Sequence, residues 1–158
     1  MANGDTPKGF APYGKVLRMN RYEAGSTVYP GDVVTLASDG QVDTTGGTGV
    51  ILGVAMNYAL VGEKLMVCDD PEQRFIAQAD ETEIDAQTDI GQTCDVTLTA
   101  GDTTYKTSRQ EVDSSTIGSS KQLVLLDYER RPDNALGGFV DAIVRINKHQ
   151  LVDAFAGV

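Results

Sequence analysis

The stretch FVDAIVRIN, residues 139–147, has the most regular pattern in the chain, because apolar side chains recur at every second position. One face of an extended strand there would carry Val140, Ala142, Val144 and Ile146. The other face would carry Asp141, Arg145 and Asn147 beside Phe139 and Ile143. A strand with one wholly apolar face and one mixed face predicts a half-buried place in a β-sheet.

Other stretches show strand patterns of two kinds. Residues 94–99 alternate in the same way, with Cys94, Val96 and Leu98 on one face and Asp95, Thr97 and Thr99 on the other. Residues 51–56 and 123–126 are apolar without interruption, which is typical of strands covered on both faces. Further strands are expected at residues 15–20, 32–37, 41–42, 64–68 and 74–79.

Turn residues separate these strands at short intervals. Pro30-Gly31 suits a type II turn, Asp39-Gly40 suits a hairpin, and Asp70-Pro71 breaks the chain before residue 74. Short strands divided in this way predict an all-β domain, either a small β-barrel or a β-sandwich. At most one short helix is expected, with Thr82 as its cap, Asp85 at its third position and Gly91 as its stop.

The 158 residues fit one domain, which can bury about two-thirds of its unfolded surface without metals or disulfides. We expect an N-terminal arm at 1–13, a β-rich domain at 14–149 and a C-terminal tail at 150–158. The first ten residues lack the apolar core of a signal peptide, and no apolar run approaches the ~20 residues that cross a bilayer. We therefore expect synthesis in a cytoplasm, no membrane partner, and buried free thiols at Cys68 and Cys94 rather than a disulfide or a zinc site.

Charge is distributed unevenly along the chain. Residues 1–22 hold four basic residues against one acid, whereas residues 69–115 hold three basic residues against twelve acids. The overall net charge of −10 argues against nucleic acid as a partner, because binding to phosphates requires clustered Lys and Arg. A basic segment on an acidic body favours docking of that segment onto an acidic surface, although chance clustering on a solvated surface would give the same counts.

The search for catalytic or ligand-binding motifs gives no strong candidate. His149 has no nucleophile motif, and the glycine-rich residues 43–49 lack the Lys-Ser/Thr ending of a phosphate loop, so a hairpin tip is expected there. The acidic residues of 80–89 have no calcium-loop spacing and predict a solvated face, and Asp69-Asp70 fits a turn better than an acid/base pair. Without tryptophan there is little material for a stacking platform. The sequence therefore predicts no enzyme, no cofactor and no metal site.

Three segments together resemble the capsid decoration (cement, or head-stabilising) proteins of tailed bacteriophages. The first has a hairpin from Pro30-Gly31-Asp32-Val33-Val34 to Asp39-Gly40, followed by Ile51-Leu52-Gly53-Val54-Ala55. The second contains Val67-Cys68-Asp69-Asp70-Pro71 and then Phe75. The third runs from Asp133-Asn134 through Gly137-Gly138 to Ile146-Asn147-Lys148-His149. The order and number of these motifs carry the resemblance, which is weakest over residues 82–120.

The resemblance implies a tulip-like β-rich body, in many such proteins a homotrimer, seated on the outer surface of an icosahedral capsid. It implies the major capsid protein as partner and a role in clamping adjacent capsid subunits of the expanded shell. Two other classes stay open at this point, namely another phage head or tail component and a small β-sandwich for adhesion or carbohydrate binding. For the capsid interface we predict Phe10 and Tyr13 as apolar anchors, with Lys15, Arg18 and Arg21 as positioning charges.

Overall fold

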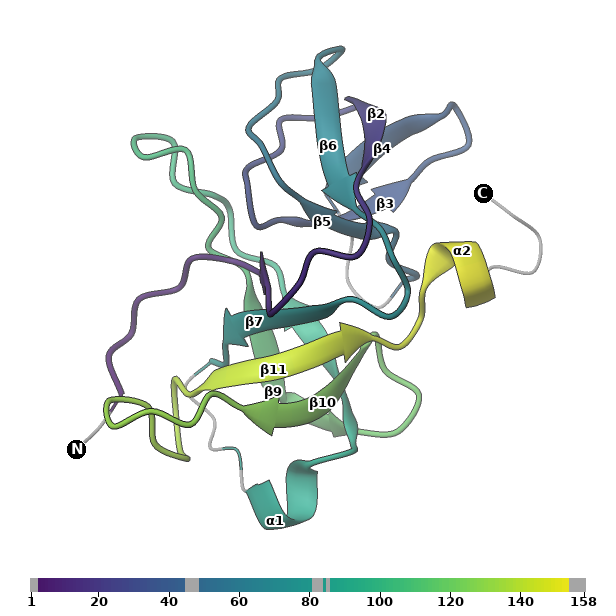
Figure 1. Cartoon of the computed structure of the whole chain (residues 1–158). Helices are drawn as coiled ribbons and strands as arrows, with labels where there is room; N and C mark the ends of the chain where they lie inside the picture. Colours follow the sequence, from purple (N-terminus) through teal and green to yellow (C-terminus); the bar gives the residue numbers. More distant parts are fainter. Residues whose placement is uncertain (1–2, 45–48, 81–83, 85, 154–158) are drawn as a thin grey trace.

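The computed structural model describes residues 3–44, 49–80, 84 and 86–153, whose strands form two packed sheets (Figure 1). The first is a closed barrel in the order β2-β4-β3-β5-β6, built from β2 (Asn20–Ala24), β3 (Val33–Leu36), β4 (Gln41–Thr44), β5 (Gly53–Ala55) and β6 (Lys64–Cys68). The second has the order β1-β7-β11-β10-β8-β9, built from β1 (Ala11–Pro12), β7 (Arg74–Gln78), β8 (Thr93–Thr97), β9 (Glu111–Gly118), β10 (Leu123–Tyr128) and β11 (Asp141–Ile146). The predicted small all-β domain is confirmed.

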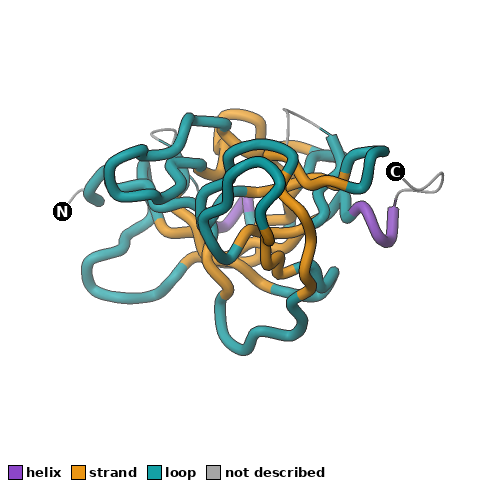
Figure 2. Tube along the Cα trace, turned by 90° about the horizontal axis from the view of Figure 1, so that it is seen from above, coloured by secondary structure: helices purple, strands orange, loops and turns teal. Residues whose placement is uncertain are grey.

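Two single helical turns accompany the strands. α1 (Ala86–Asp89) lies where a helix was expected, and Gly91 after it has the positive φ of +89° that suits a helix stop. The expected cap Thr82 and the expected third residue Asp85 lie outside the described residues. α2 (Gln150–Asp153) lies at the opposite side of the molecule from the N-terminal arm in both views (Figures 1 and 2).

β3 and β5 form a wall shared by two hydrophobic cores. Successive side chains of a strand point to opposite faces, so Val33 packs in the larger core beside the six-stranded sheet, whereas Val34 packs in the core of the barrel. On β5, Val54 and Ala55 divide in the same way. Both faces of this wall are covered, which accounts for the uninterrupted apolar run at 51–56 and confirms its predicted burial.

β11 lies between β7 and β10 in the centre of the six-stranded sheet. Its predicted apolar face is confirmed, since the side chains packed in the larger core include Val140, Ala142, Val144 and Ile146. The regular strand begins only at Asp141, because Phe139 has a positive φ of +57° that turns the chain before the strand.

Three predicted turns are also confirmed. Gly31 and Gly40 have φ values of +97° and +85°, as the type II turn and the β3–β4 hairpin require. The Asp70 carbonyl accepts a hydrogen bond from Gln73 N at 3.1 Å, which closes the turn around Pro71. Of the glycine-rich stretch 43–49, residues 45–48 lie outside the described residues.

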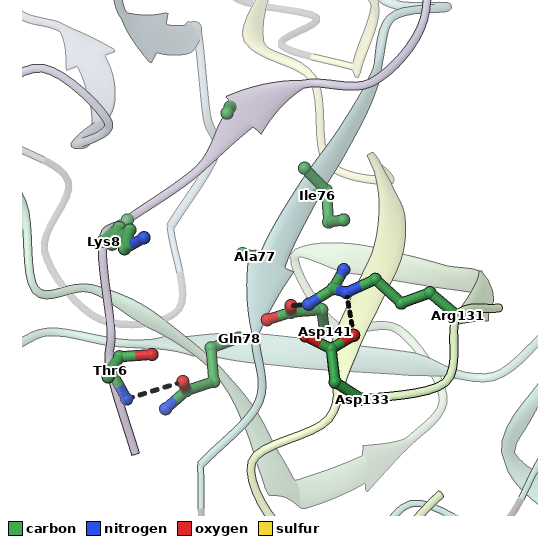
Figure 3. A pocket seen from close by; sticks show the side chains of 10 residues that line it. Thr6, Lys8, Ile76, Ala77, Gln78, Arg131, Asp133 and Asp141 are labelled. Atoms are coloured by element: carbon green, nitrogen blue, oxygen red, sulfur yellow. Dashed lines mark hydrogen bonds and ion pairs between the residues drawn. The ribbon is translucent and has the colours of Figure 1, made fainter. Parts of the chain in front are cut away.

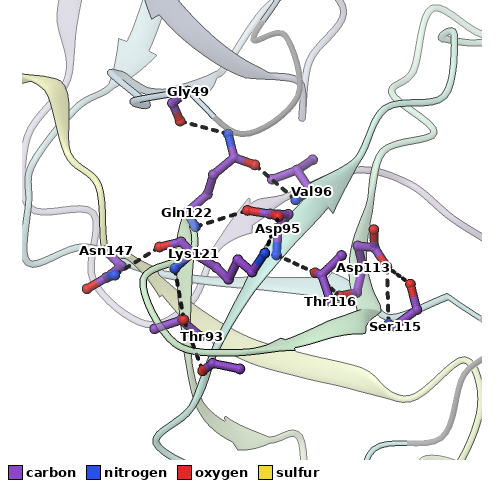
Figure 4. Close-up of polar contacts among 11 residues, drawn as sticks. Gly49, Thr93, Asp95, Val96, Asp113, Ser115, Thr116, Lys121, Gln122 and Asn147 are labelled. Carbon is purple, nitrogen blue, oxygen red and sulfur yellow. Dashed lines mark hydrogen bonds and ion pairs between the residues drawn. The ribbon is translucent and has the colours of Figure 1, made fainter.

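Two strand predictions need correction. On β10, Val124 and Leu126 are only half-buried, so this strand is fully covered on one face rather than both. β8 ends at Thr97, which leaves Leu98 exposed, and Asp95 on the predicted outer face is buried. Asp95 tolerates burial because its carboxylate accepts a hydrogen bond from Gln122 N at 3.3 Å and pairs with Lys121 at 3.7 Å (Figure 4).

Buried glutamine side chains join the barrel and its loops to the elements beside it, Gln122 from the edge of β10 and Gln150 from α2. Gln122 accepts a hydrogen bond from Val96 N at 3.1 Å and donates to the Gly49 carbonyl at 2.8 Å, as Figure 4 shows. Gln150 accepts from Leu36 N at 2.8 Å and donates to the Leu36 carbonyl at 2.7 Å. Each carboxamide thus acts as a substitute peptide group where two elements meet without a continuous strand ladder.

Candidate interface between β1 and β2

The chain passes from the six-stranded sheet to the barrel through residues 13–21, which we call the connecting strip. Its side chains are unusually apolar for an exposed segment, with exposed fractions of 39% for Val16, 48% for Leu17 and 45% for Met19. Lys15 and Arg21 are exposed on the same segment. The strip therefore presents apolar side chains interleaved with cations.

A strand was predicted at 15–20, and the structure corrects this to Asn20–Ala24. At residues 15–17 the backbone of the strip pairs with a side chain instead of a strand. Gln73, itself buried, accepts a hydrogen bond from Leu17 N at 2.8 Å and donates to the Lys15 carbonyl at 3.1 Å. These two bonds hold the strip extended while leaving its side chains in solvent.

The buried carboxylate of Asp69 gives the strip a second attachment. Arg18 Nε donates to Asp69 Oδ1 at 3.1 Å, Asn20 Nδ2 donates to Oδ2 at 2.9 Å, and the Tyr22 hydroxyl donates to Oδ2 at 2.6 Å. Burial alone raises the pKa of Asp69, but the hydrogen bonds from Tyr22, Asn20 and Arg18 outweigh it, and the net pKa lies below the ordinary value. Burial and the same carboxylate raise the pKa of Tyr22, which stays a neutral donor.

The predicted interface residues thus fall into different environments. Tyr13 and Lys15 are exposed, and so is Arg21 on β2. The charge of Arg18 is matched by Asp69. Within the described part of the chain, Lys15 and Arg21 take part in no ion pair, so their charges remain available to a partner.

Phe10 is placed differently from the prediction. Its side chain is only 3% exposed and packs in the larger core, while its backbone N donates to the Gly31 carbonyl at 2.9 Å. A side chain buried in its own domain is not available as an anchor on a partner. The arm folds back on its own body, which is a tertiary contact that no local pattern in the sequence indicates.

Further contacts fix the arm across the end of β7 (Figure 3). Thr6 N donates to Gln78 Oε1 at 2.9 Å, and β1 pairs antiparallel with β7. A cavity of about 370 Å³ remains beneath the arm. On its wall Arg131 pairs with Asp133 at 2.7 Å and with Asp141, so the guanidinium is already matched by carboxylates of its own chain.

The described residues offer little material for catalysis. They contain no cluster of three or more His, Cys, Asp or Glu placed to hold a metal ion. Both cysteines are free and buried as predicted, and burial raises the pKa of Cys68 to about 11 and that of Cys94 to about 12. His149 is buried and its Nδ1 accepts a hydrogen bond from Leu151 N at 3.2 Å. Thiols with raised pKa values are poor nucleophiles at neutral pH.

The predicted acidic face is only partly described. Asp80 accepts hydrogen bonds from Ser114 and from Thr97, whereas Glu81, Glu83 and Asp85 lie outside the described residues. Asp70 accepts from Glu72 N at 2.8 Å, as a turn residue does. No helix in the described part of the chain has the length and hydropathy to span a bilayer.

No family model matches the chain, and no curated protein is significantly similar to it. Sequence reasoning identified the cations of the strip but missed Gln73 and Asp69, which hold it. Gln73 stands in no recognisable motif, and Asp69 was interpreted as a turn residue, so only the clustering of cations in residues 1–22 pointed to this part of the surface.

Proposed function

We propose that the protein is a structural virion protein that binds the outer surface of an icosahedral phage capsid. In this role it stabilises the expanded shell by clamping adjacent major capsid subunits. The observation that carries the proposal is the connecting strip, in which Val16, Leu17 and Met19 are exposed between Lys15 and Arg21, two cations that form no ion pair with any described residue.

The strip has the physical properties of a docking element. Its apolar side chains supply area that a partner can remove from water, and its cations favour an acidic partner and orient the encounter. Because Gln73 already holds the backbone and Asp69 holds the Arg18 side chain, binding orders few additional groups and loses little free energy to that ordering.

Stabilisation of the expanded shell by such binding is a consequence of mass action. A protein that binds only the expanded lattice shifts the equilibrium towards that lattice. Assembly of the protein as a homotrimer, which the family resemblance implies, would add multivalency because each subunit then engages the lattice with the others already bound.

Co-sedimentation with expanded shells of the encoding phage tests the proposal. We expect Leu17→Asp and Lys15→Glu each to weaken shell binding by about tenfold or more, which corresponds to about 1.4 kcal/mol. Leu60→Asp is a matched control, since Leu60 is 46% exposed but lies on the β5–β6 turn outside the strip.

The possible results distinguish a wrong choice of interface from a wrong choice of function. Unchanged binding of both strip variants would place the interface elsewhere on the molecule. Absence of wild-type protein from purified particles and from reconstituted shells would refute the virion role itself.

A further inference from the structure

The described residues include five buried glutamines, at positions 73, 78, 110, 122 and 150. Four of them use both ends of the carboxamide, the oxygen as acceptor and the nitrogen as donor. These four are Gln73, Gln78, Gln122 and Gln150. Full use of both ends is what burial of an amide requires.

Gln110 departs from this pattern. Its Oε1 accepts a hydrogen bond from Val33 N at 2.8 Å, and its side chain is 3% exposed. Its Nε2, however, donates to no group in the described ranges of the chain, and the residue lines a cavity of about 280 Å³. Nε2 is not sealed in the core but reaches the cavity, so it can donate to a group bound there.

Asp32 adds a second buried polar side chain to the wall of this cavity. Asp32 is buried beside Gln110, and its carboxylate accepts a hydrogen bond from Tyr29 N at 2.9 Å. Ser108 also hydrogen-bonds to this carboxylate, and because a carboxylate has about four acceptor positions, Asp32 can still accept further donors. Asp32 is only 3% exposed, and this burial raises its pKa although the hydrogen bonds from Tyr29 N and Ser108 oppose the shift.

Hydroxyls and apolar groups complete the wall. Thr27, Thr44 and Thr99 line the cavity, and none of their hydroxyls bonds to another side chain or backbone group that the structure describes. Leu98, exposed after the end of β8, and the half-buried Tyr29 add apolar surface.

Contacts within the chain hold this wall in place. Gly101 packs so closely on Tyr29 that a Cβ there would lie 2.3 Å from Tyr29 Cδ2. Ser108 N also donates to the Pro30 carbonyl at 3.2 Å, which ties the loop of residues 98–110 to the barrel. A preformed cavity with a few converging polar groups is the usual form of a small-molecule site.

We propose that this cavity binds a single neutral sugar ring. Each sugar hydroxyl is both a donor and an acceptor, so neighbouring hydroxyls can donate to Asp32 and accept from Gln110 Nε2. The carboxylate of Asp32 disfavours anionic ligands, and the volume is just below the range of ~300–1,000 Å³ typical of drug-sized ligands. The cavity shares no residue with the connecting strip, so sugar binding does not depend on the proposed attachment to capsids.

Amide NMR of the full chain tests this directly. Methyl glycosides of neutral hexoses, 6-deoxyhexoses and N-acetylhexosamines are titrated into ¹⁵N-labelled protein, with glycerol as the probe for simple hydration. We expect at least one glycoside to shift the Gln110 side-chain NH₂ signals saturably, with the backbone signals of residues 98–101 shifting in parallel.

Two variants check the location. Thr99→Arg adds a bulky side chain at the exposed rim and should weaken binding by about tenfold or more. Thr103→Arg, on the same loop but outside the cavity, should leave binding unchanged. Gln110→Glu retains the acceptor for Val33 N but removes the donor, and should abolish binding.

Three results would overturn the proposal. They are the absence of any shift with the whole panel, equal shifts with glycerol, and wild-type affinity in Thr99→Arg. Since Thr99 is exposed, the last result does not depend on whether Gln110→Glu folds.

Discussion

At the scale of single residues, Asp69 fixes the geometry of the connecting strip, because its carboxylate accepts hydrogen bonds from Arg18 and Asn20 of the strip. The substitution Asp69→Asn puts an NH₂ group where donors from Arg18, Asn20 and Tyr22 converge, so at least one of these donors loses its acceptor and the buried amide cannot satisfy them all. We expect a loss of about 3 kcal/mol in the free energy of unfolding, measured by urea denaturation at pH 7. Asp70→Asn is the matched control, because an asparagine can accept the same bond from Glu72 N, and a change below about 0.5 kcal/mol is expected.

The same residue makes a prediction about pH. Because the folded pKa of Asp69 lies below its ordinary value, its ionised form stabilises the fold at every pH above about 3.9, the unfolded value. That stabilisation is lost as the pH falls below about 3.9 and through the folded pKa. The stability gap between wild type and Asp69→Asn should therefore be constant from pH 7 to about 5 and should shrink below pH 4. A gap that widens in acid would show that another group controls this site.

At the scale of elements, β11 is the strand most sensitive to a single charge. Val144 is fully buried in the larger core, so Val144→Asp would bury an unpaired carboxylate at a cost of several kcal/mol. We expect little or no folded protein by circular dichroism. The adjacent Arg145→Gln is the control, because Arg145 faces outward to Glu72 at 3.3 Å and its loss should be tolerated. A folded Val144→Asp protein would contradict the packing of β11 against the larger core.

Elements whose signal is local could be predicted from the sequence, and those defined by distant partners could not. β5 and β11 lie where their apolar patterns indicated, because the spacing of apolar residues along a strand reports directly which of its faces are buried. The exposed segment around Leu17 has a similar apolar pattern, but Gln73, far along the chain, takes its backbone hydrogen bonds. The burial of Phe10 also depends on residues far along the chain, because it packs against β3, β5 and the six-stranded sheet. Gln110 carries no sequence signal at all.

At the scale of the whole molecule, the shared wall of β3 and β5 predicts cooperative unfolding. Val33 and Val34 belong to different cores but to one strand, so the barrel cannot unfold without uncovering the larger core. Leu65→Ala in the barrel should cost about 2–5 kcal/mol. It should also expose Cys94, in the larger core, at the same urea concentration at which the barrel is lost. Thiol labelling followed by peptide mapping measures this, and labelling of Cys94 well after barrel loss would show that the two cores unfold separately.

Clamping is also tested by comparing how strongly the protein binds unexpanded and expanded shells. A clamp occupies a composite site made by adjacent capsid subunits, and the relative positions of those subunits change when a precursor shell expands. We therefore expect much weaker binding to unexpanded than to expanded shells. Purified protein is mixed with both forms, with and without chelator, and occupancy is measured together with the temperature at which the shells open.

Saturated expanded shells should open at a higher temperature than bare ones, because ligand bound to one state stabilises that state by mass action. Chelator should change nothing, since the described residues offer no clustered metal ligands. Equal occupancy of both shell forms, or an unchanged opening temperature at saturation, would contradict clamping even for a protein found in the particle. Chelator-sensitive binding would instead point to the acidic residues of 80–89 as a metal site.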